Sequence, residues 1–222
     1  MTTDRFSFQK GDGLLIVDVQ NDFLPGGALA IEKGDEIIPE LNRVLKQAAE
    51  TRIPVYASRD WHPAGHVSFR EQGGEWPPHC LQDTEGAAFS SALDLPEDAL
   101  VVTKGVRFDK DQNSAFDQTG LAERLKKDGV QRLVVGGLAQ DVCVLATVLD
   151  ARSHGFDVLL LEEATKPVSV EGGRNALTEM IKAGAKFVDA ELDVCTYAPE
   201  WAEHQRPGDT EDACDDGRSG KI

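Results

Sequence analysis

The sequence predicts a three-layer α/β/α fold, in which a mostly parallel sheet of about six strands is covered by helices on both faces. Short apolar runs of strand length alternate along the chain with longer segments whose apolar residues recur at helical spacing. The short runs are almost continuously apolar, which is typical of strands that are buried on both faces. Such strands belong to parallel sheets.

The expected strands and helices follow one another in a regular order. The strands are predicted at residues 13–19, 53–58, 100–103, 133–137, 157–161 and 186–188. Helices are predicted at residues 34–50 and 119–128, from the turn after the fourth strand to about residue 154, and at residues 171–183. Pro39 falls in the first turn of the first helix, where proline is tolerated, and Gly155 suits the end of the third.

Length and composition indicate one globular domain. The chain has 222 residues, of which 41% are hydrophobic and 28% charged. We expect a single domain over residues 1–201 and an acidic, flexible tail over residues 202–222. No apolar run is long enough to span a bilayer, and the first ten residues have no apolar signal core, so we expect a cytoplasmic protein.

Charge and cysteine usage exclude some classes of partner. A net charge of -16 argues against nucleic acid and against an anionic membrane surface. Cysteines at positions 80, 143, 195 and 214 form no CxxC pair, so we expect thiols and not disulfides.

Four predicted strands end near residues that apolar packing does not explain. Asp18 follows the first strand, Asp60 the second and Lys104 the third, and the fourth leads into the turn of Cys143. An aspartate after a strand is often only a cap, and a lysine there is often a solvated charge. In open parallel sheets, however, ligands bind outside the carboxyl ends of the strands, so together these residues predict one pocket.

Cys143 is a candidate nucleophile. It falls in the first turn of a predicted helix, where unpaired N–H groups and the helix dipole favour a thiolate. The alternative is an inert cysteine packed as a small apolar residue. Asp18 could take the thiol proton and return it to a leaving amine, while Lys104 holds the carboxylate and stabilises the thiolate.

A long polar segment after the second strand carries a candidate metal site. Asp60-x-His62, followed 17 residues later by His79, suits a mononuclear site with open positions for water and ligand. Zinc, iron and manganese all fit one carboxylate and two imidazoles. We expect His66 to orient a ligand, and we assign no role to Cys80. The alternative is a loop whose histidines only cap turns.

Five motifs follow one another along the chain. In order, they are Ile-Val-Asp18-Val-Gln-Asn-Asp-Phe23, Asp60-Trp-His62-Pro-Ala-Gly-His66-Val-Ser-Phe69, Trp76-Pro-Pro-His79-Cys80, Thr103-Lys104-Gly105 and Gly137-Leu-Ala139-Gln-Asp-Val-Cys143-Val. With these motifs in this order, the chain resembles the nicotinamidases, which belong to the isochorismatase-like cysteine hydrolases. The resemblance runs from about Gly13 to Val188.

The resemblance implies an isochorismatase-like, Rossmann-like fold and a metal-dependent amidohydrolase of NAD salvage. Such an enzyme converts nicotinamide to nicotinate and ammonia through a cysteine thioester, and also hydrolyses pyrazinamide. It implies one divalent metal ion per chain, with zinc as first choice. Family members often self-associate, which makes a homo-oligomer an expectation.

The resemblance also implies roles for particular residues. Its catalytic triad corresponds to Asp18, Lys104 and Cys143, and its metal ligands correspond to Asp60, His62 and His79. The oxyanion hole corresponds to the backbone N–H groups of Ala139 and Cys143, with a cis peptide before Ala139. Phe23 and Trp76 correspond to aromatics on either side of the pyridine ring.

One departure from the family and two alternatives stay open. Asn113 stands where many members have a tyrosine that contributes to the pocket wall, which affects the expected ring selectivity. One alternative is another amidase of the same superfamily, acting on a ureido or carbamoyl substrate. The other is a non-catalytic, metal-bound thiol module.

Overall fold

The computed structural model describes residues 6–188, and its centre is an all-parallel, six-stranded sheet. The strand order is β3-β2-β1-β4-β5-β6. This confirms the predicted fold class. The strands are β1 (Asp12–Val17), β2 (Val55–Asp60), β3 (Leu100–Lys104), β4 (Arg132–Leu138), β5 (Asp157–Lys166) and β6 (Lys186–Phe187).

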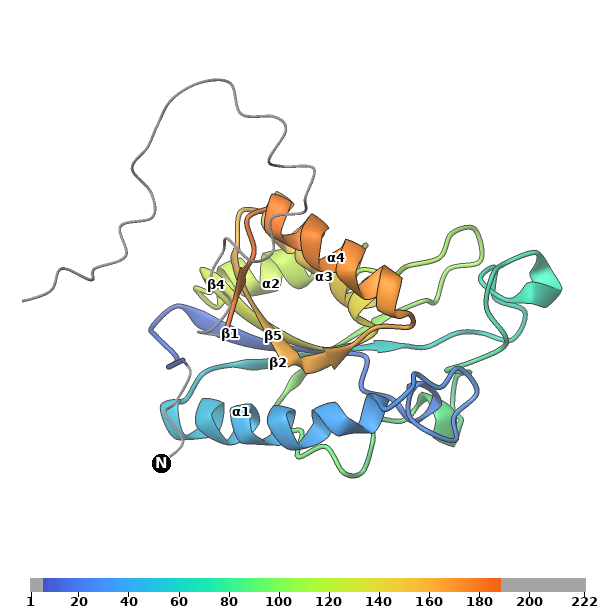
Figure 1. The fold of residues 1–222 in the computed structure, drawn as a ribbon, viewed down its shortest axis with the longest axis horizontal. Coiled ribbons are helices and arrows are strands. Elements are labelled where there is room, and N and C mark those ends of the chain that lie inside the picture. Colours follow the sequence, from blue (N-terminus) through green and yellow to red (C-terminus); the bar gives the residue numbers. More distant parts are fainter. Residues whose placement is uncertain (1–5, 189–222) are drawn as a thin grey trace, which may run out of the picture. The chain divides into compact units, whose positions relative to one another are not determined.

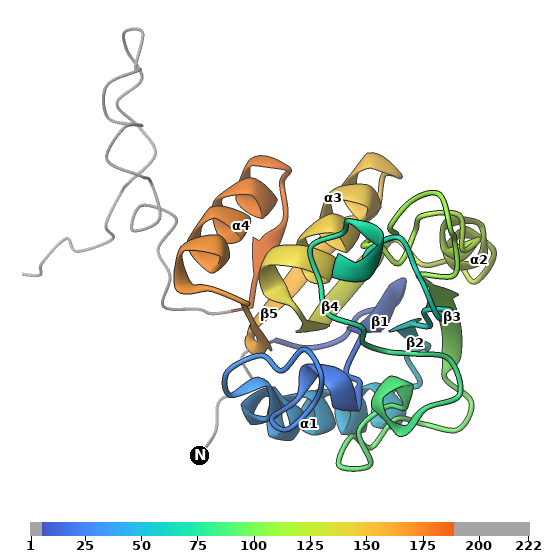
Figure 2. The same cartoon turned by 90° about the vertical axis from the view of Figure 1, so that its right-hand side faces the viewer.

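Helices cover the sheet on both faces, which makes the three predicted layers (Figures 1 and 2). Helix α1 (Ile38–Thr51) lies on one face. The other face carries α2 (Leu121–Lys127), α3 (Leu145–Ser153) and α4 (Val170–Lys182). Among the described residues, no helix is both long and apolar enough to cross a membrane.

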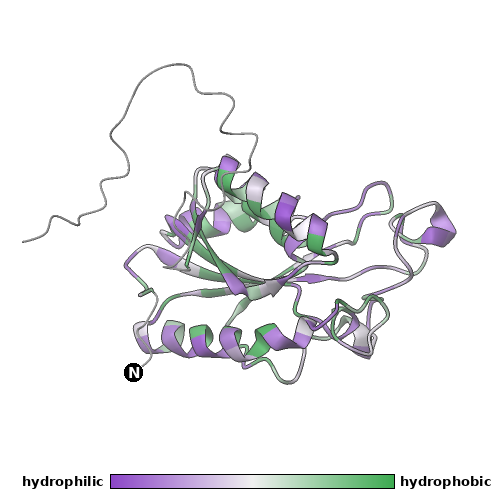
Figure 3. Ribbon diagram, in the orientation of Figure 1, coloured by the Kyte–Doolittle hydropathy of each residue, from purple (hydrophilic) through white to green (hydrophobic). Residues whose placement is uncertain are grey.

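The alternation of side chains along β1 explains why two separate cores form. Leu14 and Ile16 point to the α1 layer and pack with its buried residues. Leu15 and Val17 point to the opposite layer and pack with α2, α3 and α4. Because successive side chains of a strand face opposite sides, a continuous apolar run serves both cores. Figure 3 shows the resulting hydrophobic centre between helices with polar outer faces.

Most element bounds differ from the expectation by one or two residues, and two differ by more. The predicted helix at 34–50 begins as a 3-10 turn, Gly34–Ile37, before α1. Strand β5 continues to Lys166, beyond the predicted end at residue 161, because Glu162 and Glu163 interrupt its apolar pattern without ending the strand. The predicted boundary between domain and tail lies outside the described residues, as do Cys195 and Cys214.

The carboxyl ends of the parallel strands meet at one edge of the sheet, and this edge carries the loops that contain the motifs. Close pairing of the two central strands depends on Gly137 of β4. Its φ is 130°, and a Cβ atom there would collide with the backbone oxygen of Val17. Only glycine therefore lets β4 approach the end of β1 closely enough to bring the following turn beside Asp18.

Candidate active site

Cys143 lies in a tight turn between β4 and α3. Residues Gln140–Val144 form one turn of π-helix, and the preceding Leu138–Ala139 peptide is cis. The Ala139 carbonyl accepts the N–H groups of Val142 at 3.1 Å and of Val144 at 3.0 Å. The turn therefore holds a nearly buried thiol at the end of the sheet.

Lys104 is the centre of the cluster around this thiol. Its side chain is fully buried, and its Nζ lies 2.8 Å from Oδ2 of Asp18 and 3.5 Å from Sγ of Cys143. The same Nζ lies 2.6 Å from Oδ1 of Asp60. The expected proximity of Asp18, Lys104 and Cys143 is present, while the contact with Asp60 has no signal in the sequence. One ammonium thus joins the cysteine cluster to the predicted metal ligands.

The protonation states follow from burial and from these neighbours. Burial raises the pKa of the Cys143 thiol well above its usual range, against the opposing effect of Lys104. Burial also raises the pKa of Asp18, although Lys104 and the Ser58 hydroxyl at 2.7 Å oppose the shift. Burial lowers the pKa of Lys104, but Asp18 and Asp60 outweigh it and raise that pKa well above its usual value. The resting site therefore holds a neutral thiol, an ammonium and a carboxylate that is more basic than usual.

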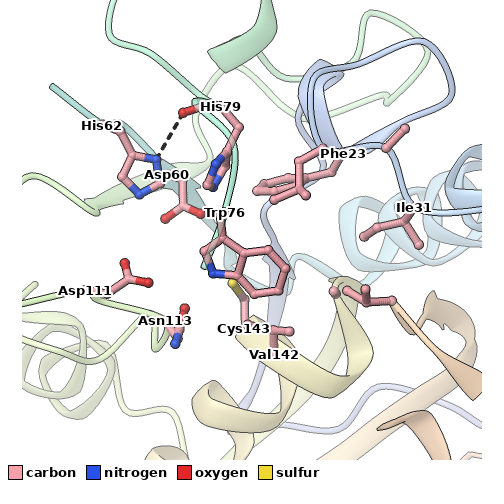
Figure 4. Close-up of a pocket in the computed structure, with 14 residues that line it drawn as sticks. Phe23, Ile31, Asp60, His62, Trp76, His79, Asp111, Asn113, Val142 and Cys143 are labelled. Carbon is pink, nitrogen blue, oxygen red and sulfur yellow. Dashed lines mark hydrogen bonds between the residues drawn. The ribbon is translucent and has the colours of Figure 1, made fainter. Parts of the chain in front are cut away.

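Asp60, His62 and His79 form a second cluster, in which one donor atom from each lies within 4.8 Å of the others (Figure 4). Nδ1 of His62 lies 3.2 Å from the backbone oxygen of His79, and Nδ1 of His79 lies 2.8 Å from the backbone oxygen of Pro77. A carbonyl only accepts, so both Nδ1 atoms carry the proton. In a neutral His62 ring, Nε2 is then left with a free lone pair, as in a metal-binding histidine.

The chemistry of this donor set fits a divalent cation. Nε2 of His62 is buried and has no hydrogen-bond partner among the described residues. Burial lowers the pKa of His62 to about 4, so the ring is neutral near pH 7. Burial tends to raise the pKa of Asp60, but Lys104 and His62 hold it below its usual value, so the carboxylate is charged. An unpartnered imidazole nitrogen beside a carboxylate is a suitable ligand pair.

Gly105 explains how this cluster reaches so close to β3. Its φ is 70°, and a Cβ atom there would lie 2.7 Å from Nε2 of His62 and 3.1 Å from Oδ1 of Asp60. The glycine after Lys104 therefore leaves the space in which these two donors meet.

Two further residues lie near the cluster. His66 is fully buried, with its ring centroid 4.3 Å from that of His62 and its Nδ1 2.8 Å from the Ser68 hydroxyl oxygen. His62, His66 and Asp111 form a second group of donors within 4.8 Å. Cys80 is buried, and burial raises the pKa of its thiol.

A pocket opens beside both clusters, and aromatic, aliphatic and polar side chains line it (Figure 4). Phe23 and Trp76, the expected aromatics, are both in its wall, and Asn113 also faces it. Residues that sequence reasoning missed include Ile31, Asp111 and Val168, because nothing in their spacing distinguishes them from ordinary loop residues. The predicted residues in the lining are Phe23, Asp60, His62, Trp76, His79, Asn113, Ala139 and Cys143.

Comparisons with known proteins find one matching family model and several similar proteins. The model of the isochorismatase domain family matches residues 12–191. A nicotinamidase of Escherichia coli K12 is 37% identical over 195 residues, which cover 78% of this chain and 92% of that protein. A nicotinamidase/pyrazinamidase of Mycobacterium tuberculosis is 35% identical over 181 residues, covering 79% and 97%. Among solved structures, the pyrazinamidase of Pyrococcus horikoshii in complex with zinc has a TM-score of 0.77 and 46% identity, and the match covers 80% of this chain and 98% of that one.

Proposed function

Since the chain belongs to the isochorismatase family, and since nicotinamidases are among its relatives, we propose that it hydrolyses nicotinamide to nicotinate and ammonia in NAD salvage. Pyrazinamide, a close ring analogue, is expected to be a second substrate. The observation that carries the proposal is the position of Lys104, whose Nζ lies 3.5 Å from the Cys143 sulfur and 2.6 Å from Asp60. A thiol with a neighbouring base and a three-donor cluster thus share one pocket.

In this proposal Asp60, His62 and His79 hold one divalent metal ion per chain. Zinc is the first choice, and iron and manganese are the alternatives. The neutral ring of His62 and its free lone pair support this role, as does the zinc in the P. horikoshii pyrazinamidase. When bound, the ion supplies a Lewis-acidic contact for the pyridine nitrogen and so orients the ring.

The chain's own residues then carry out acyl transfer. Asp18 takes the proton of the Cys143 thiol, and the thiolate attacks the carboxamide carbon. Lys104 stays protonated and stabilises the negative charge of the thiolate and of Asp18. A raised pKa makes Asp18 a better proton acceptor, which suits this step.

The tetrahedral intermediate places an oxyanion near the nucleophile turn. The backbone N–H groups of Ala139 and Cys143 are the proposed donors, each worth roughly 3–4 kcal/mol by analogy with other acyl-transfer sites. Collapse of the intermediate breaks the C–N bond, and Asp18 returns its proton to the leaving nitrogen, which departs as ammonia. The acyl group remains on Cys143 as a thioester.

Water completes the cycle. Asp18, again a carboxylate, takes a proton from a water molecule as its oxygen attacks the thioester carbon. Nicotinate leaves, and the proton on Asp18 returns to the Cys143 sulfur. Phe23 and Trp76 are proposed to hold the ring between them during both halves of the reaction. A cytoplasmic location and self-association of the chain remain predictions from the sequence.

Ammonia release from purified protein tests the function. We expect release from nicotinamide and from pyrazinamide, and loss of release after treatment with a chelator. Readdition of zinc, iron or manganese in separate samples identifies the ion that restores it. Absence of release from nicotinamide by metal-loaded protein would overturn the proposal. Full activity after complete metal removal would overturn the role given to Asp60, His62 and His79.

The nearest alternative is an amidase of the same family that acts on a ureido or carbamoyl substrate. A substrate panel at equal concentrations separates the two. We expect kcat/KM for nicotinamide to exceed that for every ureido and carbamoyl amide. The reverse order would make the alternative the better assignment.

A further inference from the structure

Gln20 has a completely buried side chain that hydrogen-bonds both the carbonyl and the N–H of Asp60. Its Nε2 donates to the Asp60 carbonyl at 2.7 Å and to the Ala87 carbonyl at 2.8 Å. Its Oε1 accepts the N–H of Asp60 at 2.8 Å. Both amide hydrogens and the amide oxygen are thus used on backbone groups.

The backbone of Asp60 needs these hydrogen bonds because β1 ends before β2 does. Strand β2 pairs with β1 only as far as Ser58, opposite Val17, whereas its pairing with β3 continues to Asp60, opposite Lys104. On its β1 side, Asp60 has therefore passed the end of the neighbouring strand. The Gln20 side chain supplies there the donor and the acceptor that a strand backbone would have supplied. Without them, buried peptide groups of Asp60 would lose their partners, which is costly.

Asp22, two residues later, holds the segment of the two histidines in a similar way. Its Oδ2 accepts the N–H of Cys80 at 2.7 Å, and its Oδ1 accepts the N–H of Ala28 at 3.1 Å. Cys80 follows His79 directly and has an unusual φ of 45°. The Cys80 carbonyl in turn accepts the N–H of His62 at 2.8 Å. One carboxylate thus anchors the backbone next to both imidazoles.

We propose that Gln20 and Asp22 are positioning residues for the metal site, which hold the backbone of Asp60 and of Cys80, next to His79, without contacting the ion. This inference rests on the proposed metal role of Asp60, His62 and His79. Partners that orient metal ligands from behind contribute to affinity, and their loss weakens binding by about 10- to 100-fold. Each of the two residues therefore sets how tightly the chain binds a divalent ion.

The test measures the affinity of purified full-length protein for Zn²⁺, by competition with a chromophoric chelator after metal removal. Gln20→Met keeps nearly the same volume and removes every hydrogen bond of the amide. We expect its Kd for Zn²⁺ to rise by about 10- to 100-fold. Asp22→Ala is expected to act in the same direction, and it provides a second route if Gln20→Met does not fold.

Asn42 offers a matched control. Its side-chain amide also bonds backbone groups through both of its polar atoms, away from the site: Nδ2 donates to the Ala92 carbonyl and Oδ1 accepts the N–H of Asp94, both at 2.9 Å. We expect Asn42→Leu to leave the Kd for Zn²⁺ unchanged. Leu125→Ala, at a fully buried position of α2, controls for stability alone. It should lower the unfolding temperature and leave the Kd unchanged.

The outcomes separate this inference from the proposed function. Unchanged Zn²⁺ affinity in folded Gln20→Met and Asp22→Ala, with tight binding by the wild type, would overturn the inference alone. Equal losses of affinity in Leu125→Ala would also overturn it, because the effect would then report stability. Failure of the wild type to bind Zn²⁺ would overturn both this inference and the proposed metal site.

Discussion

The two halves of the site are positioned by different kinds of structure. In the cysteine half, each residue comes at or just after the end of a strand: Asp18 after β1, Lys104 at the end of β3, and Cys143 in the turn after β4. In the metal half, only Asp60 belongs to the sheet. His62 and His79 lie on the long connection between β2 and β3, where hydrogen bonds from side chains to backbone groups hold the chain.

The sheet is therefore enough to place the nucleophile, whereas the metal ligands also need hydrogen bonds from side chains to the backbone around them. The parallel ladder determines where each strand ends, so residues at strand ends meet without further help. A connection without a ladder has to satisfy its buried peptide groups in another way. Lys104 contacts both halves, through Asp18 on one side and Asp60 on the other.

The largest expected effect comes from removing the nucleophile. Cys143→Ala should lower the rate of ammonia release from nicotinamide on the order of 10⁴- to 10⁶-fold, by analogy with other nucleophile deletions. The Kd for Zn²⁺ should stay unchanged, because no proposed metal ligand depends on the thiol. Steady-state kinetics and chelator competition on the same preparation measure the two quantities. A large loss of Zn²⁺ affinity would show that the two halves are not separately positioned.

A smaller effect is expected from the substitution Gly105→Ala. Gly105 follows Lys104 in the chain, but its replacement should affect the metal half of the site. The new Cβ would press on Nε2 of His62 at 2.7 Å. We expect the Kd for Zn²⁺ to rise by about 10- to 100-fold, and stability to fall by about 1–2 kcal/mol because alanine disfavours the left-handed backbone. Denaturant unfolding and chelator competition check both values.

Gly129 provides the comparison for that variant. Its φ of 77° is also left-handed, and a Cβ atom there would meet no described atom within 4 Å. Gly129→Ala should therefore show the same loss of stability and no change in Zn²⁺ affinity. If both variants bind Zn²⁺ with equal affinity, the crowding of His62 is not the cause.

The smallest effect is expected at Tyr56, which lies near the start of β2, away from the strand ends that carry the site. Its hydroxyl donates to Oδ2 of Asp128 at 2.7 Å. Tyr56→Phe should cost about 1 kcal/mol of unfolding free energy at neutral pH. Ammonia release and Zn²⁺ affinity should both stay at the wild-type level. A loss of either would mean that contacts within the sheet are coupled to the site.

The same tyrosine has a defined pH signature. Burial and the neighbouring Asp128 carboxylate raise the pKa of Tyr56 above its ordinary value. The folded state thus favours the neutral phenol, and this contribution is fully present below the unfolded pKa of about 10 and is lost as pH rises above it. Wild-type stability should therefore fall more steeply than that of Tyr56→Phe at alkaline pH. Parallel stability curves for the two proteins would contradict this.

Much of the fold can be predicted because continuous apolar runs, and the points where they end, are visible within short stretches of the sequence. Asp18 and Lys104 stood out since a polar residue at the end of a buried strand is not explained by packing. Gln20 and Asp22 did not stand out, although they lie in the same motif. Their partners are backbone groups 40 and 58 residues away, and backbone groups leave no trace in the residue pattern.

The close-range geometry of the site was also beyond sequence reasoning. The contact of Lys104 with Asp60 depends on the register that places these two residues opposite each other in β2 and β3. The π-helical form of the turn at Gln140–Val144 has no pattern of its own, since an ordinary helix start has the same apolar spacing. Asn113 does face the pocket, and its effect on ring selectivity stays a prediction.

The strand order β3-β2-β1-β4-β5-β6 has a consequence for the order in which the site can form during synthesis. Strands β1, β2 and β3 are neighbours both in the chain and in the sheet, so residues 12–104 can pair before β4 is translated. Asp18, Asp60 and Lys104 can therefore meet in a nascent chain that still lacks Cys143. The strand order therefore allows the thiol to be added last, to a partly assembled sheet that already carries its base and its cation.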